Sequence, residues 1–125
     1  MKPFFELRMY QVLPGKLNDW LSFMERVVIP FQVAHGMVIH GSFVLDSTDE
    51  FMLKDGNRVM ESTKDGNTYV WIRRFENEEQ KKKLYAAVYE SKEWIEKIGP
   101  QVGQLIDRNS IVVHNLSTTA LSVMK

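Results

Sequence analysis

The chain has 125 residues, and its sixteen basic and sixteen acidic side chains give a formal net charge of zero. This length predicts one domain over residues 1–125, because single cores commonly serve about 100–150 residues. The 44% hydrophobic and 26% charged content excludes a disordered or collagen-like chain. Balanced charge argues against a nucleic-acid partner, which requires a basic surface. Cysteine is absent, which excludes thiol catalysis and disulfides and favours a cytoplasmic location.

The sequence also predicts neither a signal peptide nor a membrane span. The first residues, Met1 to Glu6, become polar at once, unlike a signal peptide. No apolar run approaches the roughly 18 residues that a transmembrane helix needs.

Alternating apolar and polar residues predict strands over 4–12, 36–46, 68–75 and 110–116. Between the first two strands, apolar residues at helical spacing follow Gly15 and predict a helix. We expect this helix to end at Ile29, because a residue before proline is disfavoured in the helical conformation.

The second helical region lies between the last two strands. Asn77 is a suitable N-cap, and Glu78 and Glu79 follow where acidic residues favour the helix dipole. A further helical pattern runs from Ser91 towards the last strand. The resulting order is strand, helix, strand, strand, helix, strand. It predicts an α+β, ferredoxin-like βαββαβ fold, in which both helices cover one face of a four-stranded antiparallel sheet.

The segment 47–66 is too long to be a simple connection in a compact domain. Lys-Asp-Gly-Asn occurs twice in it, at 54–57 and 64–67. Because Asp-Gly is a strong hairpin turn signal, we expect an extra hairpin in this segment, formed by residues 51–53 and 58–60.

The predicted sheet has one apolar face and one polar, aromatic face. We assign the apolar face to the helices; it carries Leu7, Met9, Met37, Ile39, Phe43, Val70 and Ile72. The uncovered face then carries Glu6, Arg8, Tyr10, His40, Ser42, Tyr69, Trp71 and Arg73, and His114 joins it if Val113 points at the helices. Such a face either packs on a second subunit or lines a pocket. Both hold if two sheets face each other across a cavity.

Several blocks along the chain resemble the NIPSNAP family. The blocks are Glu6-Leu7-Arg8-Met9-Tyr10 with Pro14-Gly15-Lys16, Gly36 with Gly41-Ser42-Phe43, Val70-Trp71-Ile72-Arg73-Arg74-Phe75, and Tyr89-Glu90-Ser91-Lys92-Glu93-Trp94 with Pro100. Their joint order and spacing extend over most of the chain. The segment 47–66 departs from the family pattern because it is longer than the usual connection.

This resemblance implies a dimeric α/β-barrel, in which two ferredoxin-like subunits pair their sheets face to face. The wider superfamily includes cofactor-independent monooxygenases, heme-degrading enzymes, chlorite dismutases and small-molecule isomerases. Since one fold supports many activities, the resemblance alone assigns no reaction.

Acid–base chemistry is the catalysis that the candidate residues favour. His40, His114 or Tyr10 would remove a proton from a phenol or enol, and Arg8 would stabilise the anion. Trp71 and Tyr69 would stack on a flat substrate, and the remaining predicted ligand-binding residues are Glu6, Ser42 and Arg73. The structural alternatives are interface packing for the two aromatic residues and, for Arg8, an ion pair with Glu6 or with a carboxylate of the partner subunit.

No motif in the sequence indicates a metal or a cofactor. Histidine spacings of the HxxxH or HxH kind are missing, and so are GxGxxG, GxSxG and P-loop patterns. We therefore predict no metal site and no cofactor.

Three functions follow from these observations. The first is an uncharacterised NIPSNAP-like homodimer, paired through its sheet faces, that binds a small apolar or aromatic molecule in the sheet cavity. The second is a cofactor-independent monooxygenase acting on phenolic or enolic substrates. The third is a non-catalytic protein-interaction module.

Overall fold

The structure is a computed structural model, and it describes residues 2–45, 52–56, 58–61 and 65–125. Its main sheet has four antiparallel strands in the order β2-β5-β1-β6. These strands are β1 (Phe4–Val12), β2 (Val38–Val44), β5 (Thr68–Phe75) and β6 (Ile106–Leu116). The two central strands, β1 and β5, have the bounds that the alternation of residues predicts.

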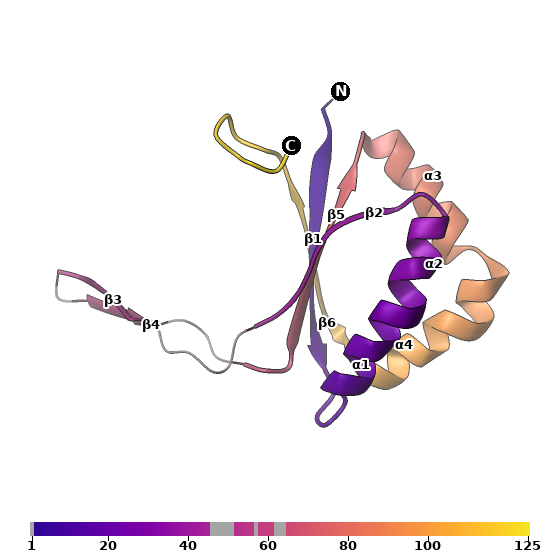
Figure 1. The fold of residues 1–125 in the computed structure, drawn as a ribbon, viewed down its shortest axis with the longest axis horizontal. Helices are drawn as coiled ribbons and strands as arrows, with labels where there is room; N and C mark the ends of the chain where they lie inside the picture. Colours follow the sequence, from indigo (N-terminus) through magenta and orange to yellow (C-terminus); the bar gives the residue numbers. More distant parts are fainter. Residues whose placement is uncertain (1, 46–51, 57, 62–64) are drawn as a thin grey trace.

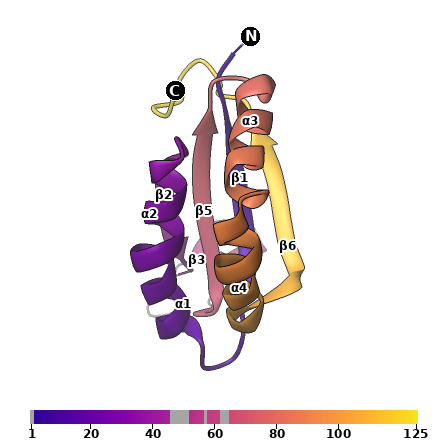
Figure 2. The ribbon, with the colours of Figure 1, turned by 90° about the vertical axis from the view of Figure 1, so that its right-hand side faces the viewer.

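Two helical regions cover one face of this sheet (Figures 1 and 2). The first consists of α1 (Leu17–Phe23), the π-helix η1 (Met24–Val28) and α2 (Ile29–Ala34). The second consists of α3 (Glu78–Tyr89), the π-helix η2 (Trp94–Ile98) and α4 (Gly99–Leu105). The α3 helix begins as expected, because the Asn77 side chain accepts a hydrogen bond from the Gln80 N–H. The predicted α+β, ferredoxin-like arrangement is confirmed.

The first helical region passes through Pro30 instead of ending at Ile29, so that prediction is wrong. The N–H of Ile29 donates to the carbonyl of Met24, five residues earlier, and the N–H of Gly99 donates to the carbonyl of Trp94 in the same way. In each region a proline follows this wide turn directly. A regular helix would bring the proline ring against the carbonyl four residues earlier, and the π turn relieves that clash.

The predicted hairpin is present as a separate two-stranded sheet. Its strands, β3 (Met52–Asp55) and β4 (Arg58–Glu61), pair antiparallel, with Asp55 opposite Arg58. Figure 1 places the hairpin on the side of the main sheet that faces away from the helices. Residues 46–51, 57 and 62–64 of the predicted hairpin region lie outside the described residues.

The assignment of the two sheet faces is wrong, because the polar, aromatic face lies beneath the helices. Its cross-strand pairs are Phe4 with Phe75, Glu6 with Arg73, Arg8 with Trp71, and Tyr10 with Tyr69. Glu6, Arg73 and Tyr69 are fully buried. The opposite face is mainly aliphatic and carries no helix (Figure 1). We call it the open face; it contains Leu7, Met9, Phe43, Val70, Ile72 and Val112.

An irregularity in β2 breaks the simple alternation that the sequence suggested for this strand. Ile39 pairs with Arg73 and Gly41 pairs with Ile72, so His40 is the extra residue of a β-bulge. The bulge places Ile39 with the helices and leaves Phe43 on the open face. A bulge of one residue therefore separates residues that strict alternation assigns to one face.

The C-terminal segment after β6 returns across one end of the open face. Phe5, Ile72 and Leu116 line a shallow hollow together with residues of 117–124. Nε of Arg74 donates to the carbonyl of Lys125 at 2.7 Å. Among the described residues, no helix has both the length and the apolar character needed to cross a membrane.

Candidate functional site

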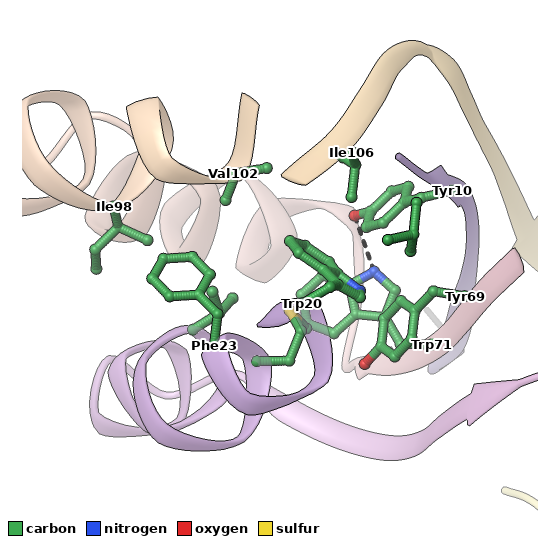
Figure 3. Packing of buried hydrophobic residues seen from close by; sticks show 11 residues of the cluster. Tyr10, Trp20, Phe23, Tyr69, Trp71, Ile98, Val102 and Ile106 are labelled. Carbon is green, nitrogen blue, oxygen red and sulfur yellow. Dashed lines mark hydrogen bonds between the residues drawn. The ribbon is translucent and has the colours of Figure 1, made fainter. Parts of the chain in front are cut away.

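A cavity of about 320 Å³ lies between the helices and the sheet. Strands β1, β5 and β6 form its floor, and α1, η1, α3, η2 and α4 contribute the other walls. Its lining is mainly apolar and aromatic and comprises Arg8, Tyr10, Trp20, Met24, Val28, Trp71, Tyr85, Tyr89, Trp94, Val102, Ile106, Arg108 and Ile111. Figure 3 shows part of this lining, with Trp20 packed above Tyr69 and Trp71. The size and composition are typical of a small-molecule site.

Both π-helices contribute to the cavity walls. Met24 and Val28 come from η1, and Trp94 comes from η2. A π turn changes the direction in which following side chains project, and such turns often occur at functional sites. Pro30 and Pro100 therefore influence the shape of the cavity without lining it.

A buried ion pair stands beside the cavity. Nη2 of Arg73 lies 2.6 Å from Oε1 of Glu6, and neither side chain is accessible to solvent. Nζ of Lys81 lies 2.7 Å from Oε2 of Glu6, and the Tyr85 hydroxyl donates to the same oxygen. Burial alone would raise the pKa of Glu6, but Arg73, Lys81 and Tyr85 outweigh it and lower this pKa to about 2. Glu6 is therefore an ionised carboxylate with both of its oxygens engaged.

The second terminal nitrogen of Arg73 is also hydrogen-bonded, whereas its Nε is buried without a partner among the described residues. Its Nη1 donates to Oε1 of Gln32 at 2.8 Å and to the hydroxyl of Tyr89 at 2.7 Å. Its guanidinium group stacks over the Trp71 ring, with 4.6 Å from Cζ to the ring centroid. Burial lowers the pKa of Arg73, but Tyr89, Glu6 and Tyr85 reverse the effect and raise it above the usual value. These contacts give Arg73 a structural role in joining sheet to helix.

Arg8 has a different environment, although it comes from the same strand as Glu6. Its side chain lines the cavity and is 16% exposed. Its Nη1 donates to the Tyr89 hydroxyl at 3.4 Å, and its Nε, 3.8 Å from Oε1 of Glu6, is buried without a hydrogen-bond partner. Burial opposes the charge of Arg8, but Tyr10 and Tyr89 raise its pKa above the usual value. Arg8 is thus a partly buried cation with few hydrogen-bond partners.

Tyr10 is a neutral phenol in this site. Its hydroxyl accepts a hydrogen bond from Nε1 of Trp71 at 2.9 Å (Figure 3). Burial raises the pKa of Tyr10 to about 12, although Arg8 opposes this change. A phenol with this pKa is almost entirely protonated at neutral pH, so it serves as a hydrogen-bonding group there.

The structure brings together only part of the predicted site. Glu6, Arg8, Tyr10, Trp71 and Arg73 lie side by side beneath the helices, instead of facing a second sheet. Tyr69 is buried among them, and its hydroxyl lies 2.5 Å from Oγ of Ser42, at the β2 edge.

His40 and His114 lie on the other side of the sheet. The His40 ring packs edge-on against Phe5, and His114 is paired with Leu7 in the β6 register. Both side chains are exposed. The sheet therefore separates the two predicted histidine bases from Arg8 and Tyr10.

The sequence prediction missed the cavity residues that the helices contribute. Tyr85 and Arg108 are not among the predicted site residues, and Tyr89 and Trp94 enter the prediction only through a block that resembles the NIPSNAP family. One signal was present, because Tyr85 and Tyr89 are four residues apart and so lie on one side of α3. Their rings contact each other edge to face at 5.0 Å between centroids.

A wider hollow of about 480 Å³ lies on the outer side of Tyr85 and Tyr89. Its rim carries charges of both signs from Glu78, Lys81, Lys82 and Glu90, so it offers no net charge to a ligand. The described residues contain no group of three or more histidine or carboxylate side chains placed to hold a metal ion. The inner cavity is therefore the stronger candidate site.

The chain is similar to several solved structures. A NIPSNAP family protein from Agrobacterium tumefaciens is 19% identical, covers 97% of this chain and 90% of its own, and superimposes with a TM-score of 0.71. A second protein from that organism, described as a NIPSNAP family protein with unknown function, is 18% identical over 99% and 95% of the two chains, with a TM-score of 0.72. A NIPSNAP domain protein from Burkholderia xenovorans is 12% identical over 95% and 97%, with a TM-score of 0.73.

The sequence matches no protein-family model and no curated protein sequence. At identities below 20%, the structural similarity establishes the fold, and it extends over nearly the whole chain. The protein therefore has a NIPSNAP-like fold, as the sequence blocks suggested, and the neighbours with this fold include proteins of unknown function.

Proposed function

We propose that the protein binds a small apolar or aromatic molecule in the cavity between its helices and its sheet. The observation that carries this proposal is the cavity itself, which is large enough for a small organic molecule and is lined mainly by aromatic and aliphatic side chains. A buried network of hydrogen bonds between Glu6, Arg73 and their neighbours holds the adjoining wall in place. Such preorganised walls favour ligand binding, because fewer groups need to be ordered when the ligand enters.

Intrinsic fluorescence tests the proposal, because Trp20, Trp71 and Trp94 all line the cavity. We expect a saturable fluorescence change with small aromatic probes such as naphthalene derivatives. Val102→Trp would fill part of the cavity from α4 and is expected to weaken binding at least tenfold. Ile95→Trp is the control, since Ile95 is 59% exposed and does not line the cavity. Equal binding by both variants would contradict the proposed location.

The monooxygenase is the less favoured function. It needs a base near Arg8, and among the described residues no histidine lines the cavity. Tyr10 is close to Arg8, but its raised pKa makes it a weak source of phenolate at neutral pH. Binding a ligand without oxygen chemistry needs no base, so it requires no loss of a proton from Tyr10 or from a histidine.

The open face supports a homodimer as the functional unit. Phe43 is 53% exposed, and Val112 and Leu116 are also exposed, so one chain leaves a row of large apolar side chains uncovered. Exposed apolar patches of this kind mark interaction surfaces. The β3–β4 hairpin projects on the same side of the sheet (Figure 1). A second copy packed on this face would cover the patch.

Light scattering coupled to size exclusion tests the dimer. We expect twice the mass of one 14.6 kDa chain for the unmodified protein and a shift towards the single-chain mass for Phe43→Glu. Ile95→Glu, an exposed apolar position on the helical side, is the matched control and should leave the mass unchanged. A single-chain mass for the unmodified protein would contradict the dimer, while leaving cavity binding open to its own test.

We also propose a cytoplasmic location, which the cysteine-free sequence supports because disulfides are typical of oxidising compartments. The same cavity binding is expected under reducing and non-reducing conditions.

A further inference from the structure

The charges around the cavity are unbalanced. Within the part of the chain that the structure describes, its lining includes Arg8 and Arg108 but no aspartate or glutamate. The carboxylate beside it, Glu6, is already engaged by Arg73, Lys81 and Tyr85. Glu6 therefore neutralises one of the three surrounding cations, and two positive charges remain among Arg8, Arg73 and Lys81.

Arg8 is the member of this group that is turned to the cavity and poorly partnered. Arg73 uses its terminal nitrogens on Glu6, Gln32 and Tyr89, whereas Arg8 makes one long hydrogen bond to Tyr89. The Nε of Arg8, the Nε of Arg73 and the Nε1 of Trp20 are buried and donate to no described atom. Of these three residues, Arg8 and Trp20 line the cavity, and Arg8 is the one that carries a charge. Because a guanidinium group keeps its charge and can only donate, the missing partner must be an acceptor, and an anion suits it best.

The remaining walls define the rest of the ligand. Trp71 and Trp20 provide flat surfaces, and Met24, Val28, Val102 and Ile106 provide aliphatic ones. Arg108 is the exposed residue of the lining and donates to the carbonyl of Gly99 at 2.6 Å, which places it at the mouth of the cavity. A ligand complementary to these walls has an apolar body and one anionic end.

We infer that the cavity selects an apolar monocarboxylate, whose carboxylate accepts hydrogen bonds from the Arg8 guanidinium while its aromatic or branched body packs against Trp71 and the aliphatic walls. This inference rests on the proposed binding function and adds the chemical class of the ligand. A carboxylate matches the fork of donors on one arginine. A phosphate dianion would need more donors than the mainly apolar lining offers. A neutral ligand would leave the Arg8 guanidinium with only the distant Glu6 carboxylate, 3.8 Å from its Nε, as a counter-charge.

Paired probes with the same body but different ends test this inference. The pairs are 2-naphthoate with 2-naphthamide and 4-biphenylcarboxylate with its amide, titrated at pH 7 and followed by tryptophan fluorescence. We expect each carboxylate to bind at least tenfold more tightly than its amide, since hydrogen bonds to charged groups contribute about 1.5–3 kcal/mol. Benzoate and decanoate extend the series to smaller and to flexible bodies.

Arg8→Gln assigns the preference to Arg8. It is expected to abolish the preference for carboxylates while leaving amide binding within about threefold. Arg8→Lys should keep part of the preference, because it retains a charge but loses the planar fork. Arg26→Gln, on an exposed arginine of η1 outside the cavity lining, is the control and should bind like the unmodified protein. Circular dichroism shows whether each variant is folded.

The outcomes separate this inference from the proposed function. Equal binding of carboxylates and amides by the unmodified protein would overturn the inference and leave cavity binding intact. A carboxylate preference that survives Arg8→Gln in a folded variant would overturn the role of Arg8. Binding of none of the probes, charged or neutral, would overturn the proposed function and the inference together. The comparison within the unmodified protein remains decisive even if the Arg8 variants fail to fold.

Discussion

The two faces of the main sheet show two different ways of burying a β-sheet. The face beneath the helices holds the ion pair Glu6–Arg73 among tyrosines and tryptophans, and its polar atoms are largely satisfied within the chain. The open face is aliphatic, and Phe43 and Val112 are exposed on it. Apolar character alone therefore does not identify the face that a chain covers with its own helices. A face left for a second copy can be more apolar than the internal one.

The largest expected loss of folding stability follows from removing the buried ion pair on the helix-covered face. Arg73→Gln would leave Glu6 buried with fewer partners and is expected to destabilise the fold by about 3–5 kcal/mol. Urea unfolding at a fixed protein concentration measures the change. Arg74→Gln is the matched control, because Arg74 is the next residue of β5 and its ion pair with Glu76 is partly exposed. We expect about 1 kcal/mol or less for this control, and equal losses would contradict the contrast between the faces.

Lowering the pH should reduce the stability of the fold, because Glu6 on the helix-covered face becomes protonated. Its folded pKa of about 2 lies below the reference value of 4.5, so its stabilising contribution is fully present above the unfolded pKa. That contribution is lost as pH falls from about 4.5 to 2, and the shift corresponds to about 3 kcal/mol. Urea unfolding at pH 7, 5, 4 and 3 measures it.

Glu6→Gln provides the control for this pH dependence. The variant should be less stable at pH 7 but should lose less stability between pH 5 and 3, since the group that titrates has been removed. Parallel pH profiles for the two proteins would show that Glu6 is not the carboxylate responsible.

Removing one hydroxyl from α3 should produce a smaller loss. Tyr85→Phe removes a donor to Glu6 but leaves Arg73 and Lys81 in place, so we expect about 2 kcal/mol, within the range for hydrogen bonds to charged groups. The variant should also lose stability at a higher pH than the unmodified protein, because the Tyr85 hydroxyl helps to lower the pKa of Glu6. Tyr69→Phe, whose hydroxyl bonds with Ser42 at the sheet edge, is the control, with about 1 kcal/mol expected. A smaller loss for Tyr85→Phe than for Tyr69→Phe would contradict this account.

The fold was largely predictable from the sequence, because local patterns carry it. Alternation located β1 and β5 to the residue, and Asn77 identified the start of α3. The proline rule failed at Ile29, since two widened turns allow both helical regions to continue through proline. The rule considers the residue before the proline alone and does not take a widened turn into account.

The strand residues of the candidate site could be predicted from the sequence, but the side of the sheet on which the site lies could not. Alternation correctly grouped Glu6, Arg8, Tyr10, Trp71 and Arg73, yet it is silent about which face the helices cover. The opposite charges of Glu6 and Arg73 were a signal that this face could be buried, because the two residues face each other across neighbouring strands. Two opposite charges that pair directly can be buried together, whereas the prediction placed both on the face that the helices leave uncovered. The grouping of the histidines failed for a different reason, because it assumed strict alternation through the β2 bulge and an uncovered polar face.

The smallest expected effect concerns those histidines. His40→Ala and His114→Ala change exposed side chains on the far side of the sheet, so we expect stability changes within about 0.5 kcal/mol. Neither variant should alter the affinity for 2-naphthoate, since neither residue lines the cavity. Tyr10→Phe, inside the cavity, is the positive comparison, because it leaves the buried Trp71 N–H without its acceptor and should change the fluorescence response. A loss of 2-naphthoate binding in a folded His40→Ala or His114→Ala variant would mean that the ligand is reached from the open face, and the contrast between an internal binding face and an external pairing face would fail.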